Sequence, residues 1–129
     1  MSALSIRKIR DSDDVDISVS GTLLENETRI AEIILRPTEF KEKPKTVKLN
    51  AVFHSINDGL TVTLYWEHEE VDDLMLPLNG RGILDLTRFG GLENPRKPGF
   101  TGNVVLIAER TLPGKKDFVL SLEFSKQRT

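Results

Sequence analysis

The chain has 129 residues, which is enough for one domain with a buried core and too few for two ordinary domains. Hydrophobic residues make up 38% and charged residues 29%, and the net charge is -2, which argues against disorder, a membrane span and the basic surface of a nucleic-acid-binding protein. There is no cysteine, so disulfides and thiolate chemistry are excluded and stability must come from burial and strand pairing.

The N-terminal residues 1–14 are charged and contain no apolar stretch long enough for the core of a signal peptide. We therefore expect the protein to stay in the compartment where it is made. We interpret residues 1–14 as an N-terminal arm and residues 15–129 as a single β domain. The first strand is predicted where Val15, Ile17 and Val19 alternate with polar residues.

The next segment, residues 27–37, is ambiguous, because its isoleucines fit either a short helix or a strand that is apolar on both faces. Its shortness and β-branched content favour a strand. After the apolar residues 46–56, the sequence Asn-Asp-Gly at 57–59 is typical of a tight turn, so we expect a hairpin with the strand at 60–67.

Strand 60–67 alternates strictly, which predicts that Trp66 lies in the core and leaves the position of Tyr65 open. Pro77 lacks a backbone donor, so its strand should lie at a sheet edge or carry a bulge. Further hairpin turns are predicted at 79–82 and 112–115.

Taken together, these patterns predict an all-β chain, a single-domain antiparallel β-sandwich or jelly-roll-like fold of about eight strands. The predicted strands cover residues 15–19, 27–37, 46–56, 60–67, 73–79, 82–87, 103–109 and 117–126.

One long segment, "TRFGGLENPRKPGFTG" at residues 87–102, is predicted to be neither helix nor strand. Its large apolar side chains argue against a solvated linker, and ordering its glycines is costly. We expect the loop to be ordered by contact with another subunit or a shell protein, because arginines among aromatic residues are typical of protein interfaces. The alternative, equally compatible with the sequence, is a loop that folds on its own sheet. The candidate interface residues are Arg81, Arg88, Phe89, Leu92, Arg96, Lys97 and Phe100.

Catalytic patterns are weak. His68 lies in the acidic segment "EHEEVDD", which could supply oxygen ligands to a cation but which we interpret as a solvated loop. His54 is expected to be a surface histidine or one with a satisfied ring. No nucleophile elbow or phosphate-binding loop is present, so we predict no enzyme, no catalytic residues, no cofactor and no metal.

A resemblance emerges from the order of five motifs between residues 47 and 126: "LTVTLYWE", "LPLNGRGILDL", "FGGLENP", "GFTGNVVLIA" and "DFVLSLEFSK". This order resembles a group of small virion structural proteins of tailed bacteriophages. The resemblance does not include the N-terminal third of the chain.

The resemblance implies a non-enzymatic decoration or cement protein that binds and stabilises the assembled head. Its partners would be the phage major capsid protein and further copies of itself, without nucleic acid or membrane. Its location would be the capsid surface of the virion, after synthesis in the host cytoplasm. Two alternatives remain open: a carbohydrate- or protein-binding β-sandwich that uses Tyr65 or Trp66 for stacking, and a metal-assisted hydrolase built on His54 and His68.

Overall fold

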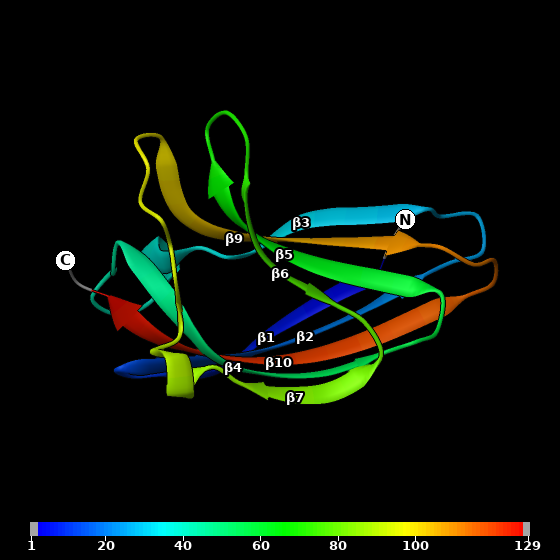
Figure 1. Cartoon of the computed structure of the whole chain (residues 1–129), viewed down its shortest axis with the longest axis horizontal. Coiled ribbons are helices and arrows are strands. Elements are labelled where there is room, and N and C mark those ends of the chain that lie inside the picture. The colour runs from blue at the N-terminus through cyan, green and yellow to red at the C-terminus, as the bar shows by residue number, and fades with distance from the viewer. Residues whose placement is uncertain (1–2, 128–129) are drawn as a thin grey trace.

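The computed structural model describes residues 3–127, and within them the chain forms ten β-strands and two short 3-10 turns. The strands make two antiparallel sheets that face each other, so the predicted all-β sandwich is confirmed (Figure 1). Eight strands were expected from the sequence, and the two additional ones are β1 and β8. Within residues 3–127 there is no helix with the length and apolar character that a membrane crossing requires.

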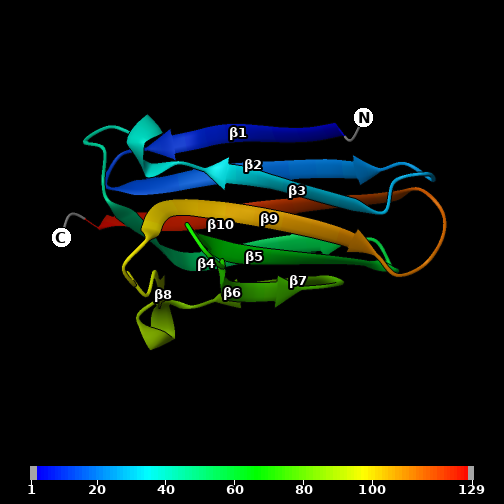
Figure 2. The ribbon, with the colours of Figure 1, turned by 90° about the horizontal axis from the view of Figure 1, so that it is seen from above.

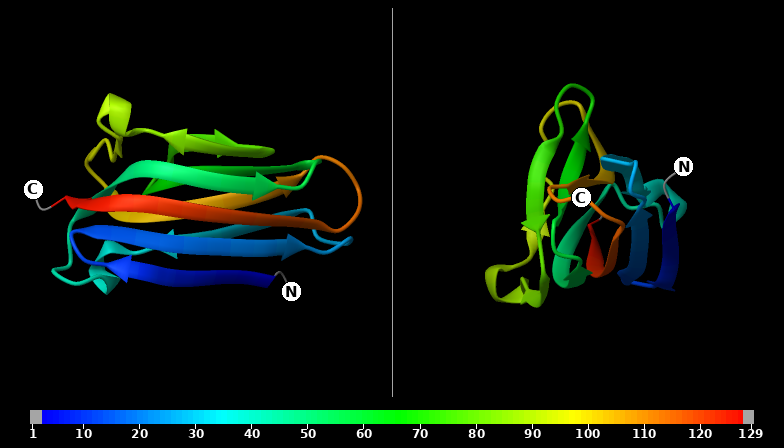
Figure 3. Two further views of the ribbon diagram at one scale, coloured as in Figure 1. Left: turned by 90° about the horizontal axis from the view of Figure 1, so that it is seen from below. Right: turned by 90° about the vertical axis from the view of Figure 1, so that its right-hand side faces the viewer.

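The larger sheet, which we call sheet A, has the order β1-β2-β10-β4-β7, and the short strand β8 also pairs with β4. Its strands lie side by side in the lower layer of Figure 1 and are seen face-on in Figure 3. The bounds are β1 Ala3–Asp11, β2 Asp14–Leu23, β10 Lys116–Gln127, β4 Thr46–Ile56, β7 Arg81–Asp85 and β8 Leu92–Glu93.

The smaller sheet, sheet B, has the order β3-β9-β5-β6 and covers one face of sheet A (Figure 2). Its strands are β3 Arg29–Leu35, β9 Phe100–Arg110, β5 Leu60–His68 and β6 Asp73–Leu78. The ambiguous segment at 27–37 therefore contains a strand, as its isoleucine content favoured. The 3-10 turns are η1 Pro37–Glu39 and η2 Thr87–Phe89.

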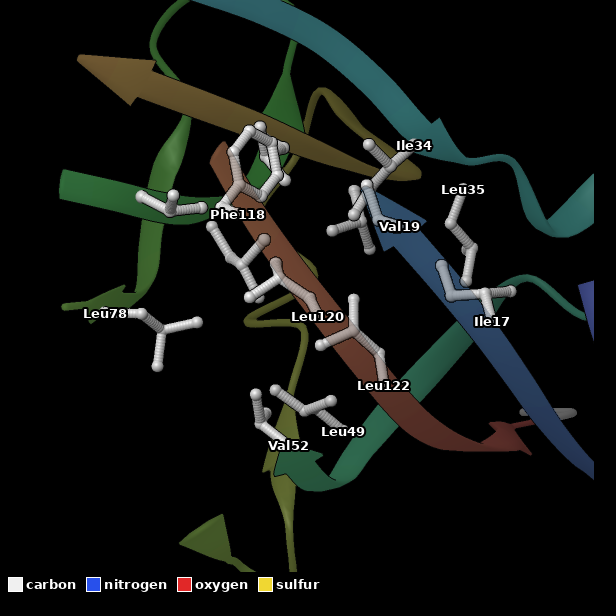
Figure 4. Close-up of a cluster of buried hydrophobic side chains, with 14 of the residues drawn as sticks. Ile17, Val19, Ile34, Leu35, Leu49, Val52, Leu78, Phe118, Leu120 and Leu122 are labelled. Carbon is white, nitrogen blue, oxygen red and sulfur yellow. The ribbon is translucent and has the colours of Figure 1, made fainter. Parts of the chain in front are cut away.

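The core lies between the two sheets, because alternate residues of each strand face inward. In β10, the residues Phe118, Leu120, Leu122 and Phe124 are buried while the residues between them are exposed. Figure 4 shows the side chains of β2, β4 and β10 converging with those of β3 and β6. A shift of one residue in register would move all of these groups into water, which fixes the pairing.

The three predicted hairpin turns do occur as turns, but none of them joins paired strands. Residues 57–59 connect β4 in sheet A to β5 in sheet B, residues 79–80 connect β6 to β7, and residues 111–115 connect β9 to β10. Each of these connections passes from one sheet to the other. The hairpin prediction was therefore wrong, because turn residues specify a reversal of the chain and not the strand with which the next segment pairs.

The interpretation of residues 1–14 as an arm also needs correction. Residues 3–11 form β1, which pairs antiparallel with β2 from Ala3 opposite Thr22 to Asp11 opposite Val15. The end of β1 is also held by a buried ion pair of Asp11 with Lys126 of β10. The segment that begins at Ala3 is thus part of the sandwich. Residues 1–2 lie outside the described residues.

The Pro77 prediction is confirmed in both of its forms. Strand β6 is an edge strand of sheet B, and its pairing with β5 shifts register between Leu64 and Tyr65, which leaves Met75 as an extra residue. A proline at this place interrupts no continuous ladder, because one side of β6 has no neighbouring strand.

Candidate interaction surface

The predicted long loop is more regular than the sequence indicated. Residues 87–102 contain the turn η2, the two-residue strand β8 and the first residues of β9. The prediction that this segment holds neither helix nor strand was therefore wrong at three places. Its glycines and prolines occupy the corners between these short pieces of structure.

The turn η2 is closed by its own backbone and by Asp85. The N–H of Phe89 donates to the carbonyl of Leu86 at 3.1 Å, and the side chain of Asp85 accepts hydrogen bonds from the N–H and the hydroxyl of Thr87. The side-chain and backbone hydrogen bonds from Thr87, together with the charge of Arg88, hold the pKa of Asp85 below its ordinary value, against a smaller opposing effect of burial. Gly90 ends the turn with φ of 80°, a conformation that favours glycine.

Sheet A holds the middle of the loop. Leu92 lies opposite Leu49 of β4 and packs against the hydrophobic core. The buried side chain of Asn94 accepts a hydrogen bond from the N–H of Arg96 at 2.9 Å. The Arg96 guanidinium in turn donates to the hydroxyl of Thr46 at 3.3 Å. These contacts fix residues 92–96 to the domain itself.

Sheet B holds the last part of the loop. The ammonium of Lys97 lies 2.9 Å from a carboxylate oxygen of Asp73, and the ring of His68 contacts the carbonyl of Pro98 at 2.7 Å. Phe100 begins β9 opposite His68 and is half-buried. The loop therefore bridges the two sheets, with one set of anchors on each.

The seven candidate residues consequently divide into two groups. Leu92, Arg96, Lys97 and Phe100 contact their own domain and hold the loop in place. Arg88 and Phe89 are exposed on η2, and Arg81 is exposed on β7. Phe89 has 83% of its surface accessible, more than any other large hydrophobic side chain among the described residues. Of the three large apolar residues in the loop, Phe89 is therefore the one that would need a partner to become buried.

The two histidines have structural contacts. His54 is buried on the inner face of β4, and its Nδ1 lies 3.1 Å from the carbonyl of Gly80. His68 Nδ1 accepts a hydrogen bond from the N–H of Glu70 at 3.0 Å. Within the part of the chain that the structure describes, no group of three or more acidic or histidine side chains is arranged to hold a metal ion. Both imidazole rings therefore make contacts with the backbone of neighbouring turns.

The aromatic pair of β5 is resolved by the fold. Trp66 is 3% exposed and lies in the core, as the alternation predicted. Tyr65 is half-buried on the opposite face of β5. Trp66 is therefore not available as a stacking surface for a carbohydrate, which removes half of the alternative proposed from the sequence.

Three exposed apolar residues were missed by the sequence analysis. Phe53, Ile83 and Val119 lie on the outer face of sheet A with 43%, 74% and 43% of their surface accessible. Phe53 of β4 lies directly opposite Ile83 of β7. Val119 of β10 lies opposite Ser55, which is two residues after Phe53 in β4 and therefore on the same face of the sheet. Alternation in the sequence shows which side chains of one strand share a face. It does not show that these three residues lie close together, because that depends on β10, β4 and β7 being neighbours in sheet A.

Comparisons with known proteins assign neither a family nor a function to this chain. No protein-family model matches the chain, and no curated protein matches it. A search of solved structures finds a chain from "Acidic stable capsid structure of Helicobacter pylori bacteriophage KHP30", with a TM-score of 0.40 and 14% sequence identity. The match covers 94% of this chain and 93% of that chain. These values are too low to assign a family or a function.

Proposed function

We propose that this chain is a non-enzymatic structural protein of a tailed-phage particle and that it decorates the head by binding the major capsid protein through η2. The particle role is supported by the order of motifs between residues 47 and 126, which resembles small virion proteins. The contact through η2 is supported by the structure of the loop. The protein would then reside on the capsid surface after synthesis in the host cytoplasm.

The observation that carries the proposed contact is the exposure of Phe89 on a turn that is held from both sides. The turn η2 is fixed by hydrogen bonds at Asp85, Leu86 and Thr87. Residues 92–100 are fixed to both sheets. An apolar anchor on such a turn binds a partner without a large additional loss of conformational entropy. Large aromatic anchors of this kind are typical of interface hot spots.

Arg88 provides the polar half of the proposed contact. It is exposed beside Phe89, and a guanidinium can donate two parallel hydrogen bonds to one carboxylate. Arg96, the other arginine expected from the sequence to pair with a partner carboxylate, is engaged with Thr46 and is better described as an anchor of the loop. We therefore place the partner's carboxylate opposite Arg88.

Co-sedimentation with heads tests this function. Phage heads that are assembled from a major capsid protein and lack this chain would be mixed with the purified protein. We expect Phe89→Ala to weaken binding by about 2 kcal/mol, or roughly 30-fold in Kd. Arg88→Ala should weaken it less and should reduce its salt dependence.

The matched control is Val71→Ala, which also shortens a highly exposed apolar side chain, 78% accessible, in the loop between β5 and β6. It should leave head binding unchanged. All three variants should melt like the wild type, because none of these side chains is buried. Failure of the wild type to bind heads would contradict the particle role. Normal binding by Phe89→Ala would contradict only the assignment of the contact to η2.

A further inference from the structure

The four edges of the sandwich are not equally protected against pairing with another chain. In residues 3–127 the edge strands are β3 and β6 in sheet B, β1 on one side of sheet A, and β7 on the other side, where the two-residue strand β8 also pairs with β4. Unpaired edges invite association, and proteins commonly block them with bulges, lysines or prolines. Whether each edge carries such a device can be read from the pairing register.

Three of these edges carry a bulge. In β1 the register with β2 shifts between Lys8 and Arg10, in β3 the register with β9 shifts between Ile33 and Leu35, and β6 shifts as described above. In each case the extra residue lies on the edge strand. Strand β1 is also basic, and β6 contains Pro77.

Strand β7 has none of these devices. Its sequence, Arg-Gly-Ile-Leu-Asp, contains no lysine and no proline, and it pairs with β4 in unbroken register from Arg81 opposite Ser55 to Asp85 opposite Ala51. Ile83 at its centre is 74% exposed. The edge of β7 is therefore regular and open, with an apolar residue at its midpoint.

The backbone of β7 presents its odd-numbered residues to the open side. The carbonyl of Gly80 accepts from the N–H of Ile56 at 2.9 Å, and the N–H of Leu86 donates to the carbonyl of Asn50 at 2.8 Å. Even-numbered residues thus direct their polar groups toward β4. By the alternation of a strand, the N–H and C=O groups of residues 81, 83 and 85 point away from β4.

The side-chain charges of β7 are complementary to those of a second copy in the antiparallel direction. If Ile83 lies opposite Ile83 of that copy, Arg81 lies opposite its Asp85, and Asp85 lies opposite its Arg81. All three side chains lie on the outer face of sheet A. Among the described residues, neither Arg81 nor Asp85 forms an ion pair within its own chain. Both hydrogen bonds from Thr87 go to one carboxylate oxygen of Asp85, Oδ1, and the charge of Arg88 also acts on this carboxylate. Opposite charges in facing positions stabilise an antiparallel pair.

We propose that two copies of this chain associate through β7, in antiparallel register about a two-fold axis at Ile83, so that sheet A continues from one copy into the other. The three outward-facing residues of each strand would form hydrogen-bonded pairs across the axis. A contact through one short strand is small, so the dimer forms in a concentration-dependent manner in solution. The inference does not depend on the particle role, since it needs only the purified chain.

Cross-linking tests the register. Because the chain has no cysteine, Ile83→Cys introduces a single thiol that faces its symmetry mate. Cα atoms of a hydrogen-bonded antiparallel pair are about 5.5 Å apart, which a disulfide can bridge. Oxidation should convert Ile83→Cys to a covalent dimer. Arg81→Cys should not cross-link, because its symmetry mate would lie roughly 13 Å away along the strand. The exposure control is Val71→Cys.

Sedimentation equilibrium of the full chain tests the charges. Arg81→Asp and Asp85→Arg each place like charges in facing positions, so each alone should lose the dimer. Mixing the two variants restores both opposite-charge pairs and should restore the dimer. Leu74→Lys, an equally drastic change at an exposed residue of the β6 edge, should leave the dimer intact. Thermal melting of every variant establishes that it folds.

Four outcomes would overturn the proposal: a wild type that remains monomeric at all concentrations, an Ile83→Cys variant that cross-links no faster than Val71→Cys, mixed charge variants that stay monomeric, or loss of the dimer in Leu74→Lys. The last would assign the contact to the β6 edge. A monomeric wild type that nevertheless binds heads would overturn the β7 dimer and leave the particle role intact.

Discussion

Replacing Asp11 with asparagine should destabilise the protein strongly, because this residue ties the first strand to the last. Its carboxylate lies 2.7 Å from the ammonium of Lys126, and the two side chains are only 6% and 2% exposed. Asp11 also accepts hydrogen bonds from the N–H of Lys41 at 3.1 Å and the ammonium of Lys8 at 3.2 Å. Asp11→Asn leaves the Lys126 ammonium buried without a counter-charge, which costs about 3–5 kcal/mol of unfolding free energy.

The same contacts give the stability a defined pH dependence. Burial raises the pKa of Asp11, but hydrogen bonds from Lys126, Lys41 and Lys8 and the charge of Lys126 lower it from 3.8 to about 2. Because the folded pKa lies below the unfolded one, ionised Asp11 stabilises the fold above about pH 4, and this stabilisation is lost as the pH falls toward about 2. The loss amounts to about 2 kcal/mol.

Urea denaturation of the wild type and Asp11→Asn, at neutral pH and at about pH 2, measures both effects. The difference in unfolding free energy should be large at neutral pH and smaller by about 2 kcal/mol in acid. The control is Lys8→Ala, which removes a half-exposed ion pair and should cost no more than about 1 kcal/mol. If Asp11→Asn costs less than this control and the difference is independent of pH, the pair is solvated and β1 is not an integral strand.

Three further substitutions are expected to act through the core and the turns, and the same urea series measures them. Phe124→Ala removes a fully buried ring and should cost about 3–5 kcal/mol; a cost under about 1 kcal/mol would mean that the two sheets are loosely packed. Gly102→Ala should cost about 2 kcal/mol or more, because its φ is +84° and an added Cβ would lie 2.2 Å from the carbonyl oxygen of Lys45, and a neutral effect would contradict this close approach. His54→Ala leaves the carbonyl of Gly80 without its ring contact and should cost about 1 kcal/mol, whereas an increase in stability would show that the ring is poorly accommodated.

The candidate surface shows where sequence reasoning was sufficient and where it failed. The composition of residues 87–102 correctly indicated an ordered segment, because apolar side chains occur between its glycines. It did not indicate which side chains were already satisfied. Leu92 and Arg96 are engaged by β4 residues far away in sequence, Leu49 and Thr46. Only when those neighbours were known did Phe89 stand out as the exposed residue.

The open edge at β7 was equally hidden from the sequence. Its residues resemble any short apolar strand, and the sequence marked Arg81 only as one of seven candidate interface residues. Edge position depends on which strands do not come to lie beside it, and that is a property of the whole sheet. The proposed pairing of Arg81 in one copy with Asp85 in the other depends on this edge position.

The sequence by itself determined the inward face of the strands in which apolar and polar residues alternate strictly. The alternation in residues 118–124 and 60–66 decides which side chains are buried, because side chains of a strand point to opposite faces in turn. Pro77 likewise predicted an edge strand or a bulge, since it lacks a backbone N–H donor. Only the tertiary structure decided which strands are neighbours. A turn such as residues 57–59 reverses the chain in the same way whether the next strand pairs with the previous one or crosses to the opposite sheet. That choice depends on contacts between strands distant in sequence, such as β2 with β10 and β3 with β9.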